Sequence, residues 1–139
     1  MTKAAVTDAQ RRLARPGRGV FDPDDLADLS EPVERHLRAA IPAGTPLVES
    51  AVVDMRGRLR LGKRWLPFRA VEPLAPHVGF LWAARVAGVV VGSDQYLDGR
   101  GRLDWRLFGR FPVAQAEGPD VDRSAAARGA AEGVWVPTA

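Results

Sequence analysis

The sequence predicts a single α+β domain in which N-terminal helices precede a curved antiparallel β-meander and a C-terminal helix. Two observations lead to this fold class. Apolar residues recur at helical spacing in residues 22–41, and a helix-forming composition returns after residue 119. Between them, short segments alternate apolar and polar residues and are separated by turns rich in Gly and Pro. We therefore expect about five to seven strands, with the domain covering residues 21–139.

The N-terminal part predicts a tail followed by two helices. Residues 1–20 are expected to be a flexible tail with at most a frayed helix, because apolar residues are sparse and Pro16-Gly17 breaks the pattern. Asp22-Pro23 is typical of a helix N-cap followed by proline at the first helical position. Ser30 begins a longer helix. Its apolar stripe needs a hydrophobic surface to cover and consists of Val33, Leu37, Ala40 and Ile41.

The central segments predict a sheet with two different faces. Arg56, Arg58 and Arg60 fall on one face of a strand, and Leu59 and Leu61 fall on the other. Later in the chain the same alternation separates Leu103, Trp105 and Leu107 from Arg102, Asp104 and Arg106. One face is thus expected to be apolar and aromatic, and the opposite face rich in arginine.

The stretch Asp98-Gly99-Arg100-Gly101 predicts a hairpin turn. A phosphate-binding loop would need a helix after its glycines, whereas an alternating strand pattern follows here. An Asp-Gly step between two alternating segments is a strong hairpin signal. We expect this stretch to supply the positive φ angles that reverse the chain.

The C-terminal part predicts a helix that depends on packing. Asp120 or Asp122 is expected to cap it, and it should run to about residue 132. Gly129 and Gly133 each cost about 1 kcal/mol of helix stability relative to Ala. The apolar Val134-Trp135-Val136 close to the last residue predicts either a truncated domain or an end docked on the core. A truncated domain would leave an unpaired edge strand, which favours homo-oligomers.

The sequence lacks the residues that several kinds of catalytic and metal-binding sites need. The chain has no cysteine, so disulfides and thiolate nucleophiles are excluded. Only two histidines are present, and Asp94, Asp98 and Asp104 do not form a calcium loop because Tyr96 occupies a ligand position. No metal or cofactor is expected. The sequence has neither an apolar run of about 18–20 residues nor a signal peptide, and a cytoplasmic location is the expectation.

Aromatic residues of the apolar face predict the main candidate site. If helices cover only part of a curved sheet, space for an apolar ligand remains between them. The candidate ligand-binding residues are Phe68, Phe80, Trp82, Trp105 and Phe111. The sequence does not decide between this role and ordinary core packing. The favoured hypothesis is a non-enzymatic binding module for an apolar or lipid-like ligand.

Two other functions stay open. An enzyme could use the carboxylates of Glu117, Asp120 and Asp98, with nearby arginines holding an anionic substrate. A binder of nucleic acid or anionic surfaces could use the arginine-rich face, with Arg56, Arg58, Arg60, Arg102 and Arg106. Nucleic acid is disfavoured because Trp105 points away from Arg102 and Arg106, so that stacking and phosphate contacts do not share a face.

Five segments carry a resemblance to a known family: LSEPVERHLRAAIP, RLRLGKRWLPFRAVEPLAP, GFLWAARV, YLDGRGRLDWRLFG and AEGPDVDRSAAARGAAEGVWVPTA. In this order they resemble an uncharacterised family of bacterial proteins of unknown function, over roughly residues 29–139. The resemblance implies that the usual domain continues beyond the V-W-x-P-T-A segment, so that this chain is its N-terminal portion. It also implies a half-barrel-like sheet with helices on its concave side, as in periplasmic lipoprotein carriers. The matching positions are Trp82, Asp98, Gly99, Gly101, Glu117, Gly118, Pro119, Asp120, Glu132, Trp135 and Pro137, and the chain departs from the pattern at Gly129 and Gly133.

Overall fold

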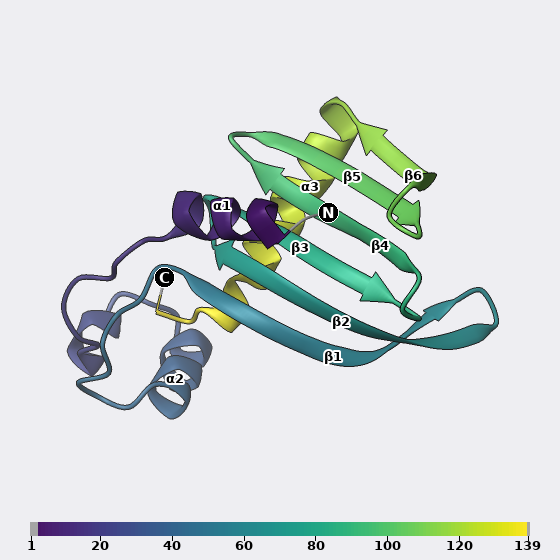
Figure 1. Ribbon diagram of the computed structural model, residues 1–139. Helices are drawn as coiled ribbons and strands as arrows, with labels where there is room; N and C mark the ends of the chain where they lie inside the picture. The colour runs from purple at the N-terminus through teal and green to yellow at the C-terminus, as the bar shows by residue number, and fades with distance from the viewer. Residues whose placement is uncertain (1–2, 139) are drawn as a thin grey trace.

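A computed structural model describes residues 3–138 (Figure 1). Residues 1–2, the start of the predicted tail, and Ala139, the end of the V-W-x-P-T-A segment, lie outside the described residues. The helices are α1 (Lys3–Leu13), α2 (Glu31–Ala40) and α3 (Pro119–Ala131), with short 3-10 helices η1 (Pro23–Leu26) and η2 (Glu132–Trp135). The strands are β1 (Ala51–Leu61), β2 (Arg64–Ala75), β3 (Gly79–Val86), β4 (Val90–Leu97), β5 (Arg100–Leu107) and β6 (Phe111–Glu117).

The six strands form one open antiparallel sheet in the order β1-β2-β3-β4-β5-β6. Each strand pairs with its neighbour in sequence, because the connections between strands are short turns. The N-terminal helices, the meander and the C-terminal helix confirm the α+β prediction. The strands β1 and β5 contain the two alternating segments from which the sequence predicts the sheet.

The two faces of the sheet differ as predicted. The apolar face includes Phe80 and Trp82 of β3, and the register places Leu74, Tyr96 and Leu103 on the same side. The arginine face carries Arg56, Arg69 and Arg85, which lie opposite one another across β1, β2 and β3. Helix α3 packs on the apolar face and α1 on the arginine face, so the helices lie on opposite sides of the sheet (Figure 1).

Helix α1 differs from the expected mobile tail. Ala9 and Leu13 are 2% and 3% exposed, and the Leu13 side chain lies beside Gly79 at the start of β3. Ala5, Ala9 and Leu13 are spaced by four residues, so they form one narrow apolar stripe. A short stripe of small residues is a weak signal in the sequence, but contact with β2 and β3 stabilises it in the fold.

Helix α2 lies apart from the sheet (Figure 1). It packs with η1 and the following loop in a small separate core formed by Phe21, Leu26 and Ile41, with Leu37 and Leu47 against it. Val33 of the predicted stripe is 45% exposed. The predicted start is confirmed, since Ser30 is the N-cap, and Asp22 caps η1 by accepting a hydrogen bond from the Asp24 amide.

The predicted hairpin is confirmed in part. Asp98 and Gly99 have φ angles of 52° and 77° and form the two-residue turn between β4 and β5. Gly101 is not part of the turn. It lies in β5 beneath α3, where a Cβ atom would come within 2.5 Å of the Val121 carbonyl oxygen. This glycine therefore allows the helix to approach the sheet backbone closely.

The start of α3 also differs from the prediction. The helix begins at Pro119 with Gly118 as the N-cap, and neither Asp120 nor Asp122 caps it. The Asp122 carboxylate instead accepts a hydrogen bond of 2.7 Å from the Gly101 amide and joins the helix to the sheet. Gly129 is buried, and a Cβ atom there would lie 3.3 Å from the Phe80 ring. Gly129 therefore lowers the intrinsic stability of the helix but lets the helix pack closely on Phe80.

β1 and β6 are the edges of the sheet among the described residues. All residues of β6 are exposed, and Pro112 removes one hydrogen-bond donor from this edge. Self-association through an unpaired edge stays a prediction. Within residues 3–138 no helix has the length and apolar character needed to cross a membrane.

Candidate functional site

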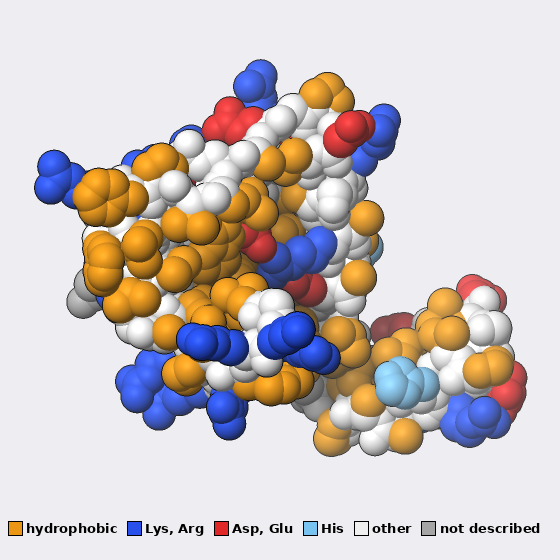
Figure 2. Space-filling model, turned by 90° about the vertical axis from the view of Figure 1, so that its right-hand side faces the viewer, with side chains coloured by type: hydrophobic (Ala, Val, Ile, Leu, Met, Phe, Trp, Pro, Cys, Tyr) orange, Lys and Arg blue, Asp and Glu red, His pale blue; other side chains and the backbone are white. Residues whose placement is uncertain are grey.

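The apolar face of the sheet is covered at one end. α3 crosses β5, β4 and β3, and the residues after it continue towards β2. Leu74, Phe80 and Val136 form the buried centre there, at 0%, 1% and 2% exposure. Figure 2 shows a broad area of apolar side chains on this side of the molecule, with acidic and basic side chains gathered beside it. α3 therefore covers one end of the apolar face and leaves the other end uncovered.

Three aromatic rings line up across the sheet beyond the covered end. The Phe68 and Trp82 ring centroids lie 5.9 Å apart, and those of Trp82 and Trp105 lie 5.6 Å apart, in tilted arrangements. We call Phe68, Trp82 and Trp105 the aromatic row. All three are half-buried. They stand on β2, β3 and β5, and the row passes over Gly92 of β4.

Two glycines make room for the aromatic row. A side chain at Gly92 would collide with the Trp105 ring and with the Asp104 carbonyl. A Cβ at Gly57 of β1 would lie 3.0 Å from the Phe68 ring. The row is also held by polar contacts of its indoles. Trp105 Nε1 donates a 2.8 Å hydrogen bond to Asp94, and Trp82 Nε1 lies 3.4 Å from Met55 Sδ.

The structure brings together three of the five predicted ligand-binding residues. Phe68, Trp82 and Trp105 form the row. Phe80 lies under α3 at 1% exposure and belongs to the core. Phe111 is at the start of β6, opposite Leu107, and is 56% exposed. It lies on the side of the sheet that carries the row, but at the edge strand.

A charged cluster lies where α3 meets the aromatic row. The Arg128 guanidinium on α3 lies 4.5 Å from the Phe80 ring centroid and 5.5 Å from that of Trp82. Its nitrogens donate to Glu72 at 3.2 Å, Asp94 at 3.1 Å and Glu132 at 2.7 Å. We call these four residues the Arg128 cluster. Because Asp94 also accepts from Trp105, the cluster and the row are connected.

Glu72 is the most buried member of the Arg128 cluster. Its side chain is 1% exposed, and burial together with the charge of Glu132 raises its pKa to about 7. Glu72 Oε2 and Glu132 Oε2 are both buried without a hydrogen-bond partner among the described residues. The cluster thus has three acids and one base, and Glu72 holds a proton more readily than an ordinary glutamate.

A cavity of about 330 Å³ lies beside the Arg128 cluster, between α3 and strands β4 to β6. Phe80, Leu103, Val121 and Ala125 are among its apolar lining residues, and Asp94 and Arg128 are among its polar ones. Cavities of this size, mostly apolar with a few polar groups, are typical of small-ligand sites.

Two of the three acids of the alternative enzyme hypothesis share a pocket, and the third, Asp120, lines the 330 Å³ cavity instead. Asp98 and Glu117 line a larger pocket of about 830 Å³ together with Arg12 and Arg102, whereas Asp120 does not line it. Each acid pairs with an arginine: Asp98 with Arg12, Glu117 with Arg102, and Asp120 with Arg123. Their side chains are 79%, 65% and 90% exposed, so none has the buried setting that tunes a catalytic acid.

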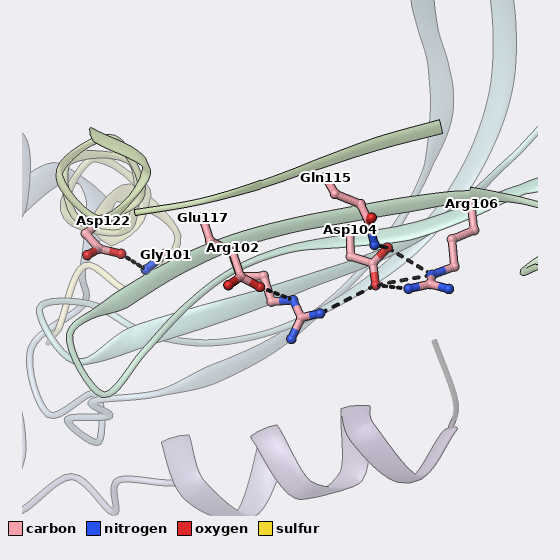
Figure 3. A network of polar contacts seen from close by, with 7 residues as sticks. All are labelled: Gly101, Arg102, Asp104, Arg106, Gln115, Glu117 and Asp122. Atoms are coloured by element: carbon pink, nitrogen blue, oxygen red, sulfur yellow. Dashed lines mark hydrogen bonds and ion pairs between the residues drawn. The ribbon is translucent and has the colours of Figure 1, made fainter. Parts of the chain in front are cut away.

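Arg102 and Arg106 of β5 are neutralised by neighbours on the same face (Figure 3). Arg106 donates to both oxygens of Asp104, and this hydrogen bond lowers the pKa of Asp104. Arg102 contacts Glu117 at 3.1 Å and Asp104 at 3.9 Å, and Gln115 donates to Asp104. Of the five arginines proposed as an anion-binding face, Arg102 and Arg106 are thus already occupied.

A family model described as "Family of unknown function (DUF6544)" matches residues 19–139. The chain belongs to this family. The match confirms the resemblance to an uncharacterised family, and DUF6544 carries no assigned activity. No curated protein and no solved structure matches the chain.

Sequence reasoning missed the two residues at the centre of the Arg128 cluster. Arg128 precedes Glu132 by four residues, a spacing that favours an ion pair on a helix, and the two side chains do pair. The sequence signal for the rest of the cluster is Glu72. It is a lone carboxylate on the apolar face of β2, between Ala70 and Leu74. A charged residue in such a position needs a buried partner. That partner lies 56 residues away on α3, and pattern alone does not identify it.

Proposed function

We propose that this DUF6544 protein is a non-enzymatic binding module for an apolar or lipid-like ligand held between the sheet and α3. The observation that carries the proposal is the aromatic row. Three large rings stand on the apolar face beyond the helix and remain half-buried. Covering such rings with an apolar chain removes their remaining surface from water, which gains about 25 cal/mol per Å².

The surroundings of the row support a ligand with two parts. The row and the apolar wall of the 330 Å³ cavity suit a hydrocarbon chain. Asp94 and Arg128 lie beside both and can hydrogen-bond a polar head group. A few polar groups at the end of an apolar surface typically fix the orientation of a ligand.

A fluorescence titration with a fatty-acid analogue tests the proposal. We expect saturable binding that unlabelled long-chain lipids displace. Trp105→Ala removes one ring of the row and should weaken binding by about tenfold or more, because an aromatic anchor contributes roughly 1.5–3 kcal/mol.

Trp135→Ala is the matched control. Trp135 is a tryptophan in η2 that is 60% exposed and lies outside the row. This variant should bind like the wild type. If folded wild-type protein shows no saturable binding, or if both tryptophan variants lose it equally, the proposal is wrong.

A further inference from the structure

The β1–β2 hairpin extends beyond the rest of the sheet. β2 pairs with β3 only from Phe68, opposite Val86, onwards, whereas the β1–β2 ladder continues to Leu61 opposite Arg64. Residues 58–67, here called the hairpin tip, therefore form a two-stranded ribbon without a third strand. Figure 1 shows this ribbon projecting past the other strands.

The hairpin carries a concentrated positive charge. Residues 56–69 contain six basic residues and no acidic one. Within residues 3–138 none of these six forms an ion pair, and Arg58 and Arg60 donate instead to backbone carbonyls of Trp65 and Gly62. Arg56 and Arg69 lie directly opposite each other, and like charges so placed destabilise a sheet. An external anion would remove this repulsion.

The hairpin tip also exposes large apolar side chains. Leu61 is 51% exposed and Trp65 is 57% exposed. Leu61 alternates onto the apolar side of the ribbon, whereas Trp65 pairs with Arg60 on the arginine side. Figure 2 shows basic side chains next to apolar ones on the side from which the hairpin projects. Tryptophan beside Lys and Arg is typical of groups that settle at a membrane–water interface.

We propose that the hairpin tip docks on the surface of an anionic lipid bilayer. Leu61 and Trp65 enter the interface, and the cations around them contact lipid phosphates: Arg58, Arg60, Lys63 and Arg64. Basic residues close to an anionic leaflet are attracted to it individually, and the attraction falls off within a Debye length. The outer edges of this two-stranded ribbon keep N–H and C=O groups without ladder partners, so the tip enters only the head-group region, where water and phosphates can pair with them.

The shape of the tip favours a bilayer over nucleic acid. A bilayer surrounds a convex turn and covers Leu61 and Trp65 together, although they lie on opposite sides of the ribbon. A single strand would follow one side and needs several aromatic platforms there. On the arginine side the described tip offers Trp65 alone. This inference does not depend on the proposed ligand, although Phe68 of the aromatic row follows Trp65 by three residues.

Vesicle flotation tests the inference. The full chain is mixed with vesicles of phosphatidylcholine alone, or with vesicles in which about 30% of the lipid is phosphatidylglycerol. Each mixture is prepared at low and at high salt. We expect the protein to float with the anionic vesicles only, and to be released as salt screens the charges. Lys63→Glu/Arg64→Glu should weaken this binding by about tenfold or more. Trp65→Ser should weaken it less, and several-fold.

Charge-matched controls and competitors make the result specific. Arg35→Glu/Arg123→Glu changes the net charge equally at two sites outside the hairpin, 71% and 79% exposed, and should float like the wild type. Millimolar inorganic phosphate should not compete. Equal binding to phosphatidylcholine, equal loss in both double variants, or displacement by free phosphate would overturn the inference. So would tight binding of a thymidine oligonucleotide without vesicle binding.

Discussion

The covered end of the sheet and the projecting hairpin use charge in opposite ways. Under α3, Arg128 is surrounded by three carboxylates and stacked on two aromatic rings. At the hairpin tip, basic side chains stand without carboxylate partners and beside exposed Leu61 and Trp65. At the covered end charge joins helix to sheet, and at the open end the fold leaves charge available to a partner. The predictions below test this difference.

Removing Arg128 should have the largest effect on stability. Arg128→Ala leaves Glu72, Asp94 and Glu132 close together without a cation, and breaking a buried pair in this way costs about 3 kcal/mol or more. Urea unfolding at neutral pH measures the change. Arg123→Ala, an exposed arginine of the same helix, is the control and should cost less than about 0.5 kcal/mol. Equal midpoints for the two variants would show that the cluster does not stabilise the fold.

Glu72 should make stability depend on pH. Its folded pKa of about 7 lies above the ordinary 4.5, so between these values the folded state binds more protons than the unfolded state. Stability is then highest below pH 4.5 as far as this group is concerned, and falls as pH rises to 7. The total change is on the order of 3 kcal/mol. The charge of Glu132 adds to this rise in the pKa of Glu72, and Arg128, which donates to the same carboxyl, opposes it.

Glu72→Gln isolates this contribution. Unfolding free energies measured across pH 5–7.5 should fall less steeply with pH in this variant than in the wild type. Glu117→Gln changes an exposed carboxylate and should keep the wild-type slope. If the free energies of unfolding of the wild type and Glu72→Gln fall in parallel as the pH rises, the raised pKa of Glu72 is wrong.

Glycine-to-alanine substitutions should lower stability more at the covered end of the sheet than at the open end, and this difference should be smaller than the effect of removing Arg128. A Cβ at Gly101 meets the backbone carbonyl of Val121, which cannot move without displacing α3, so Gly101→Ala should cost about 1–3 kcal/mol. At Gly57 the nearest atom is the end of the Phe68 side chain, at 3.0 Å. Phe68 can shift into the open side of the face. Gly57→Ala should therefore cost less than Gly101→Ala, and thermal unfolding of both proteins checks the order.

The sequence predicts the sheet well because the information is local. Alternation determines which residues share a face, and the Asp98-Gly99 step determines a turn. The same reasoning fails where a residue responds to a distant element. The sequence predicts that Gly101 belongs to the turn, but this glycine allows the approach of α3. The sequence also predicts that Gly129 weakens a helix, but this glycine allows contact with Phe80.

The candidate site is predictable only in its apolar part. Phe68, Trp82 and Trp105 are recognisable because their strand period places them on one face. Which rings the helix covers depends on where α3 crosses the sheet, and no local pattern contains that. Phe80 is therefore core although its sequence context matches that of Trp82. The Arg128 cluster joins four elements and is likewise a property of the tertiary fold.

The smallest effect on stability is expected at the hairpin tip. Lys63→Ala/Arg64→Ala should leave the free energy of unfolding within about 0.5 kcal/mol of the wild type, because both side chains are exposed and unpaired. Any change should be a gain at low salt, since like charges along the hairpin repel, and it should disappear at about 1 M salt. Thermal unfolding at both salt concentrations measures it. A clear loss of stability would mean that these cations serve the fold, and the contrast between the two ends of the sheet would then be wrong.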